Sequence, residues 1–180
     1  AHAPLLQPNE WTLSRPPRIL IVAGEASGDL HGGALATALR AMNPALQIVG
    51  IGGPAMKQAG VQVQFDIARL GIVGLVEVFA KARSIFSAYQ TAKALLKDQT
   101  DLLVLIDFPD FNLAVAKIAK QMGIPVIYYI SPQIWAWRAS RINIIRERID
   151  QMLVVFPFET DLYRKAGVPA EFVGHPIWDE

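Results

Sequence analysis

The stretch RILIVAGEASGDLHGG, residues 18–33, runs from an apolar segment into a loop of glycines, carboxylates and a serine. Its first part, RILIVA, is a continuous apolar run of the kind that is buried on both faces of a parallel sheet. After the loop, residues 29–42 have a helical pattern that the pair Asn43-Pro44 ends. This strand–loop–helix unit predicts an α/β fold and raises the question of what the loop binds.

The same alternation of strand and helix patterns continues along the chain. Strands are predicted at residues 46–52, 61–65, 102–107, 125–131, 151–156 and 170–174, and helices at 54–60, 75–97, 112–123, 138–149 and 157–167. Repeated strand–helix pairs with short connections predict a doubly wound, Rossmann-like parallel sheet with helices on both faces. Residues 1–17 hold four of the twelve prolines and no periodicity, so we predict an irregular leader there and the folded lobe over residues 18–180.

The composition argues against several classes of protein. The 180 residues fit one domain with a sizeable core, and a net charge of +1 gives no general attraction for nucleic acid. There is no cysteine, which suits a cytoplasmic protein, and the three histidines lack metal-ligand spacing, so no metal site is predicted. No apolar run is long enough to span a bilayer, and no secretory leader pattern is present.

The loop after the first strand has neither of the common phosphate-binding spacings. A dinucleotide site needs G-x-G-x-x-G and a P-loop needs G-x-x-x-x-G-K-[ST], whereas Gly24 and Gly28 are four apart and no lysine follows. The carboxylates of Glu25 and Asp29 would also repel a phosphate. Two interpretations remain: Ser27 or Asp29 caps the following helix, or the turn offers N–H groups and a carboxylate to sugar hydroxyls.

Asp107 stands at the end of an otherwise apolar strand, in the stretch IDFPDFN, residues 106–112. Pro109 is expected to stop the strand, and Asp110 is expected to cap the next helix. Asp107 has no such local duty. A carboxylate beside aromatic rings at a strand end can act as a general base, or it can pair with an arginine from a neighbouring loop.

The stretch SPQIWAWR, residues 131–138, places two tryptophans in a proline-containing loop after another strand. Aromatic faces suit sugar rings, and they also serve as anchors for a neighbouring layer. Arg138 and Arg141 follow one helical turn apart, placed to form paired hydrogen bonds to a phosphate. A solvated helix face is the alternative explanation for these arginines.

The predicted helix 75–97 carries apolar residues at three-and-four spacing, namely Leu75, Val78, Phe79, Ala82, Ile85, Phe86 and Tyr89. This periodicity favours a helix that faces the core. The segment LGIVGLVEVF, residues 70–79, is nevertheless more apolar than one buried face requires, and basic residues flank the helix. Contact with a membrane surface is therefore the alternative.

Taken together, the motifs resemble one enzyme family. VAGEASGDLHG, GIGGPAM, GIVGLVEV, LIDFPDFN, YYISPQIWAWR, PFE and FVGHPIWDE occur in the order and spacing of lipid-A-disaccharide synthases. These are inverting glycosyltransferases of the two-lobed GT-B type, and the resemblance covers residues 18–180. It implies the N-terminal lobe of a GT-B fold and a reaction without a cofactor. UDP-2,3-diacylglucosamine would be the donor and 2,3-diacylglucosamine 1-phosphate the acceptor of a β-1,6 linkage.

The resemblance also implies roles for particular residues. Asp107 matches the proposed base that takes the proton of the attacking 6-hydroxyl. Contacts to the acceptor are assigned to Glu25, Ser27, Asn112, Gln133, Trp135, Arg138 and Arg141. Contacts to a membrane are assigned to Leu75, Val78, Phe79, Ile85 and Phe86. The family resemblance further implies a cytoplasmic enzyme, peripheral at the inner face of the inner membrane, and it is compatible with an oligomer.

Members of that family are about twice as long as this chain, and their second lobe supplies most of the UDP site. We therefore expect an acceptor-binding lobe that is inactive by itself. The alternative from another class is a non-catalytic, flavodoxin-like domain that binds a small ligand. An NAD- or ATP-dependent enzyme is disfavoured because the glycine spacing and the lysine of those sites are missing.

Overall fold

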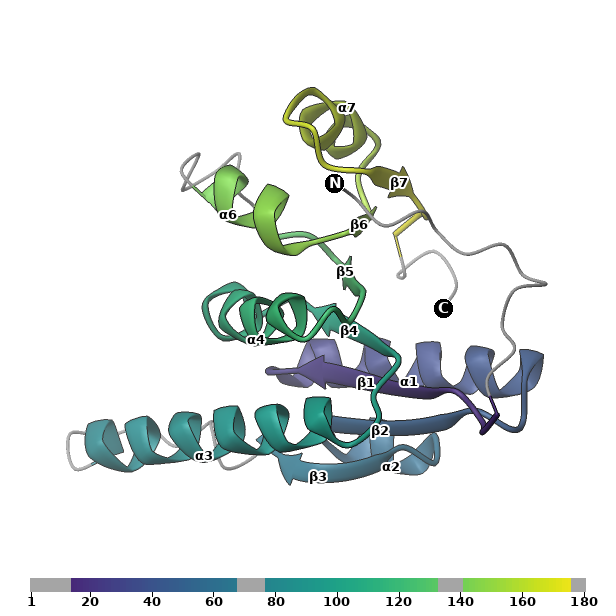
Figure 1. The fold of residues 1–180 in the computed structure, drawn as a ribbon, viewed down its shortest axis with the longest axis vertical. Helices are drawn as coiled ribbons and strands as arrows, with labels where there is room; N and C mark the ends of the chain where they lie inside the picture. Colours follow the sequence, from purple (N-terminus) through teal and green to yellow (C-terminus); the bar gives the residue numbers. More distant parts are fainter. Residues whose placement is uncertain (1–13, 68–76, 133–140, 176–180) are drawn as a thin grey trace.

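The computed structural model describes residues 14–67, 77–132 and 141–175. Seven parallel strands form one sheet in the order β3-β2-β1-β4-β5-β6-β7 (Figure 1). The strands are β1 (Arg18–Ala23), β2 (Gln47–Gly52), β3 (Gln62–Asp66), β4 (Leu102–Ile106), β5 (Val126–Tyr129), β6 (Gln151–Val154) and β7 (Ala170–Phe172). The helices are α1 (Ala26–Met42), α2 (Pro54–Gln58), α3 (Glu77–Lys97), α4 (Pro109–Gln121), α6 (Arg141–Arg148) and α7 (Pro157–Lys165). The predicted doubly wound α/β fold is confirmed.

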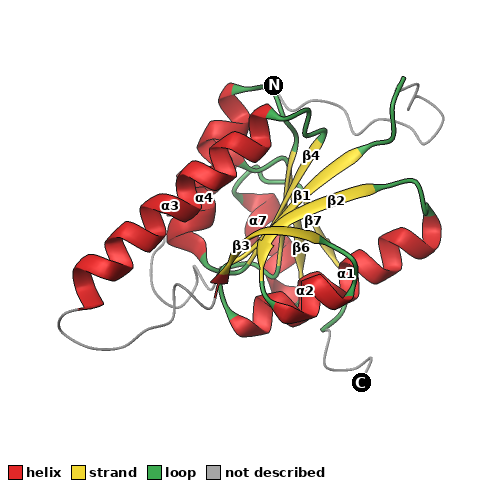
Figure 2. Ribbon diagram, turned by 90° about the horizontal axis from the view of Figure 1, so that it is seen from below, coloured by secondary structure: helices red, strands yellow, loops and turns green. Residues whose placement is uncertain are grey.

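The continuous apolar run of β1 corresponds to an interior strand that is buried on both faces of the sheet. Leu20, Ile21 and Val22 are fully buried, because helices cover both faces of the sheet at this strand. Leu20 and Val22 point to the face covered by α3, α4 and α6, whereas Ile21 points to the face covered by α1 and α2. Figure 2 shows the two helical layers on opposite sides of the strands.

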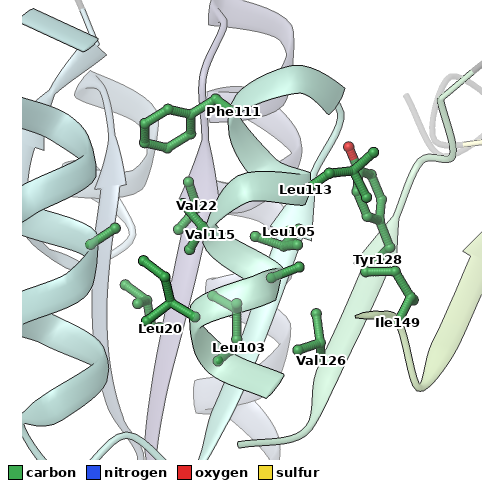
Figure 3. Packing of buried hydrophobic residues seen from close by; sticks show 14 of the residues in the cluster. Leu20, Val22, Leu103, Leu105, Phe111, Leu113, Val115, Val126, Tyr128 and Ile149 are labelled. Carbon is green, nitrogen blue, oxygen red and sulfur yellow. The ribbon is translucent and has the colours of Figure 1, made fainter. Parts of the chain in front are cut away.

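The larger core cluster lies between the sheet and α4. Figure 3 shows side chains of β1, β4 and β5 meeting those of α4, with Tyr128 among them. Pro109 and Pro157 stand at the first turns of α4 and α7, and Gly123 and Gly167 follow these helices with φ of +72° and +77°. These residues begin and end the helices because proline suits a first turn and glycine tolerates the left-handed conformation after a last turn.

The segment just before β1 is bonded to the sheet, although it belongs to the predicted leader. The Arg15 guanidinium donates to both carboxylate oxygens of Asp101, at 2.8 and 2.9 Å. The backbone N–H of Arg18 donates to the same carboxylate at 2.8 Å. Asp101 directly precedes β4, so this carboxylate ties the starts of β1 and β4 together.

Helix α3 divides into two parts. Its second half is a core helix, since Ala88, Ala92 and Leu96 are buried. Its first half projects beyond the edge of the sheet at which the strands end (Figures 1 and 2). In the part of the chain that the structure describes, no helix has both the length and the apolar character needed to cross a bilayer.

Candidate active site

The strand order reverses between β1 and β4, and the loops that follow these two strands meet there. β1 continues to β2 on one side of the sheet, while β4 pairs with β1 on the other. Ala23 and Ile106 are partners at the carboxyl ends of the two strands. Parallel sheets bind ligands in the crevice outside such a reversal. The loops beginning at Gly24 and at Asp107, which the sequence analysis singled out, therefore lie at the expected place.

Phe108 packs directly against the backbone of Gly24. A Cβ atom at position 24 would lie 2.1 Å from Cδ1 of the Phe108 ring, far inside van der Waals contact. Glycine is required here because the ring approaches the main chain closely. The contact joins the two loops of the crevice.

Of the two interpretations of this loop, the capping of α1 by Ser27 or Asp29 is wrong. Glu25 is the N-cap residue, and it makes no side-chain cap hydrogen bond. The Asp29 side chain turns away from its own helix and is buried, with a relative exposure of 4%. It accepts hydrogen bonds of 2.7, 2.9 and 3.1 Å from the backbone N–H groups of Gly53, Ala55 and Met56. Asp29 therefore caps α2, and its carboxylate is turned away from the crevice.

Glu25 and Ser27 remain exposed at the start of α1. Neither side chain hydrogen-bonds to another residue within the described ranges. One turn after Ser27, the ring of His31 lies edge-on to Tyr129 at the end of β5, with 6.5 Å between centroids. A carboxylate, a hydroxyl and two polar rings thus border one side of the crevice.

The chain turns sharply after β4, with two successive non-glycine residues in the left-handed region. Asp107 and Phe108 both have φ of 47°. Each such residue costs on the order of 1–3 kcal/mol, so the surrounding structure has to hold the turn in place. Strain of this kind concentrates at functional sites.

Two buried side chains hold the turn by its carbonyl groups. The Asn112 amide donates to the carbonyl of Asp107 at 2.6 Å and to that of Ile106 at 3.1 Å. The Tyr128 hydroxyl also donates to the Asp107 carbonyl. Burial, followed by the nearby Asp107 charge, raises the pKa of Tyr128 well above its usual value, so the phenol stays a donor at physiological pH. Asn112 was predicted to contact the acceptor, and its side chain is fully buried beneath the turn. Tyr128 was not singled out from the sequence.

The Asp107 carboxylate is half-buried at the top of this turn. Among the described residues, no arginine pairs with it, which was the alternative to a role as a base. Arg141 forms an ion pair with Asp110. The predicted capping of α4 by Asp110 is also wrong, because Phe108 is the N-cap residue and makes no side-chain cap hydrogen bond.

The segment after β5 leaves the sheet through another left-handed residue, Ile130, with φ of 62°. The buried Ser131 hydroxyl then donates to Glu159 at 2.7 Å, and the Phe156 N–H donates to the same carboxylate at 3.2 Å. Glu159 is the last residue of the PFE motif and had no assigned role. These bonds anchor the start of the SPQIWAWR segment, whose site residues Gln133, Trp135 and Arg138 lie outside the described residues.

The residues predicted to contact a membrane differ in how exposed their side chains are. Ile85 is half-buried against the core, while Phe86 is 62% exposed. Leu75 lies outside the described residues, and for Val78 and Phe79 only their place in α3 is described. Within the described ranges, no group of three or more histidine, aspartate or glutamate side chains is arranged to hold a metal ion.

We expect Gly24→Ala to lower the free energy of unfolding by about 1–3 kcal/mol, because the new methyl group overlaps the Phe108 ring. In a Phe108→Ala background the same change should cost less than about 0.5 kcal/mol, since the overlapping ring is gone. Urea denaturation of the two single variants and the double variant measures this coupling. Equal costs of Gly24→Ala in both backgrounds would contradict the contact.

Comparison with known proteins places this chain in a family. A family model described as lipid-A-disaccharide synthetase matches residues 19–180. The lipid-A-disaccharide synthase of Geobacter metallireducens is 54% identical over 163 residues, which cover 90% of this chain and 42% of that protein. The synthase of Trichlorobacter lovleyi is 51% identical over 93% of this chain and 44% of its own length. The chain thus spans less than half the length of these relatives.

Solved structures agree on the fold. A UDP-GlcNAc 2-epimerase from Neisseria meningitidis bound to UDP-GlcNAc matches with a TM-score of 0.63 at 12% identity, over 90% of this chain and 47% of that one. MurG of Acinetobacter baumannii matches with a TM-score of 0.53 at 18% identity, and the match covers 79% of this chain and 42% of that one. At such identities the likeness concerns only the Rossmann-like lobe of GT-B proteins. Because the family match spans nearly the whole sequence, the chain belongs to the lipid-A-disaccharide synthase family.

Proposed function

We propose that this chain is the acceptor-binding lobe of an inverting glycosyltransferase that makes the lipid A disaccharide. The observation that carries the proposal is the Asp107 carboxylate, half-buried, without an ion-pair partner in the described part of the chain, and held at the strand-order reversal by a strained turn. The proposed acceptor is 2,3-diacylglucosamine 1-phosphate, and the proposed donor is UDP-2,3-diacylglucosamine. Family membership supports both assignments.

In the proposed reaction, Asp107 accepts the proton of the acceptor 6-hydroxyl while that oxygen attacks the anomeric carbon of the donor. The anomeric bond to the UDP oxygen breaks with its electron pair remaining on UDP. The new bond forms on the opposite face, which gives the β-1,6 linkage. Asn112 and Tyr128 act as positioning residues, since they bond to the main chain of the turn and so orient the carboxylate.

The remaining site residues would hold the acceptor. Glu25 and Ser27 are exposed beside the turn, where a carboxylate and a hydroxyl can bond to sugar hydroxyls. Arg138 and Arg141 would supply the cations for the 1-phosphate. Gln133 and Trp135 complete the proposed acceptor contacts. Most of the UDP site would come from the part of the relatives that this chain does not cover.

We also propose a place for the enzyme in the cell. A diacylated acceptor resides in a membrane, so the protein would lie peripherally at the inner face of the inner membrane, on the cytoplasmic side. The exposed Phe86 on the projecting half of α3, together with the apolar residues Leu75, Val78, Phe79 and Ile85, would contact the membrane surface.

Two calorimetric titrations of the 180-residue chain test the proposal. We expect heat of binding from an acceptor with short acyl chains and none from UDP. Arg138→Ala should abolish the first signal, whereas Arg146→Ala, which removes an exposed arginine of α6, should leave it unchanged. Binding of UDP without any response to the sugar phosphate would overturn the assignment of this lobe. If neither ligand gives heat of binding, the result favours the non-catalytic alternative.

A further inference from the structure

An apolar groove of about 500 Å³ lies between α3 and the start of α4. It is lined by Ala82, Ile85, Phe86, Tyr89, Phe108, Asp110, Phe111 and Ala114. Only Asp110 among these residues is charged, and Arg141 pairs with it. The volume is typical of a small-molecule site. A ligand in this groove would meet almost only carbon, so the groove suits a hydrocarbon chain.

The groove is continuous with the candidate active site through one residue. Phe108 lines the groove, and the same ring lies against Gly24 in the crevice. Its neighbour in the chain is Asp107, and the left-handed conformation of both residues sets where the ring and the carboxylate lie. Inside the groove, Phe108 contacts Phe111, with 5.8 Å between ring centroids. The Phe108 ring therefore borders both the crevice and the groove.

We infer that this groove holds one fatty acyl chain of the acceptor while its sugar lies beside Asp107, an inference that rests on the proposed function. A chain attached to a sugar in the crevice can enter the groove along Phe108, because this ring borders both. Asp110, the charged residue of the lining, is paired with Arg141, so the lining presents no unpaired carboxylate to an acyl chain. An acyl chain tethered to the sugar accounts for both the apolar lining and the continuity.

The test is a series of acceptors with acyl chains from two to eight carbons, titrated into the 180-residue chain below their micelle concentrations. We expect affinity to rise about fourfold for each methylene that enters the groove, and then to level off when the groove is full. Ala82→Phe and Ala114→Phe fill the groove from α3 and α4, and both should flatten this dependence. Ala41→Phe places the same side chain on an exposed position of α1 and should leave the dependence intact.

The outcomes separate this inference from the proposed function. If the wild-type chain binds all members equally, the groove assignment fails while the acceptor-binding lobe stands. If affinity rises with length but neither filled variant changes the slope, the acyl chain binds elsewhere and the assignment fails. If filling the groove abolishes binding to phosphatidylglycerol vesicles without changing the slope, the groove takes membrane lipid, which also overturns it. If no member binds, the proposed function fails as well.

Discussion

Asp107→Asn is expected to lower the rate of sugar transfer at least about a hundredfold, the low end of what a general base contributes. The amide has the size of the carboxylate but cannot accept a proton. Asparagine also tolerates the left-handed conformation found at position 107, so the turn and its bonds to Asn112 and Tyr128 should persist. The effect should therefore fall on kcat, with little change in the KM for the acceptor.

The assay needs a full-length enzyme, which is made by joining this chain to the following part of the Geobacter metallireducens relative. The unsubstituted fusion establishes the reference rate. Asp161→Asn, an exposed carboxylate on α7, is the matched control and should keep that rate. Turnover by Asp107→Asn within a few-fold of the reference would remove Asp107 from the role of base.

The largest expected effect on stability comes from Asp29→Ala. The change removes a buried carboxylate and leaves the three N–H groups of the first turn of α2 without their acceptor. A buried donor left without a partner costs about 1–3 kcal/mol, so we expect a loss of at least about 3 kcal/mol in the free energy of unfolding. Urea denaturation of the 180-residue chain measures this loss directly.

Asp98→Ala is the comparison, because Asp98 is an exposed carboxylate whereas Asp29 is buried. Asp98 is 64% exposed and pairs with Arg18 at the surface, an arrangement worth less than about 1 kcal/mol. If both variants lose a similar, small free energy of unfolding, the Asp29 cap on α2 stabilises the protein no more than a surface ion pair does. The helix content of the Asp29→Ala variant at low temperature then shows whether the loss of structure is confined to α2.

Most of the fold could be predicted because its signals are local. The apolar run of β1 and the proline and glycine positions around α4 and α7 mark elements without reference to the rest of the chain. The predicted ends of helices and strands were less accurate where tertiary contacts determine them. The strand predicted to reach residue 131 ends at Tyr129, since Ile130 adopts the left-handed backbone conformation. Helix α4 begins at Pro109, three residues earlier than predicted.

The signals for the candidate site are local only in part. Asp107 stood out because a carboxylate is unusual at the end of a buried strand. Asp29 and Asp110 were both interpreted as local caps, but their partners are distant in sequence: the start of α2 for Asp29 and Arg141 for Asp110. Tyr128 looked like an ordinary core residue, because its role depends on a carbonyl that only the folded turn presents.

The pairing of β1 with β4 has a consequence for how the protein folds. Arg18 and Asp101, which are bonded at the start of these strands, lie 83 residues apart in the chain. Closing so long a loop is entropically costly, and folding slows as such distant contacts become more numerous. The crevice consists of the two loops that this pairing brings together. During synthesis, the ribosome has to release the whole of β1 to β4 before Asp107 and Gly24 can meet, so the candidate active site cannot form from either loop with its local sequence neighbours alone.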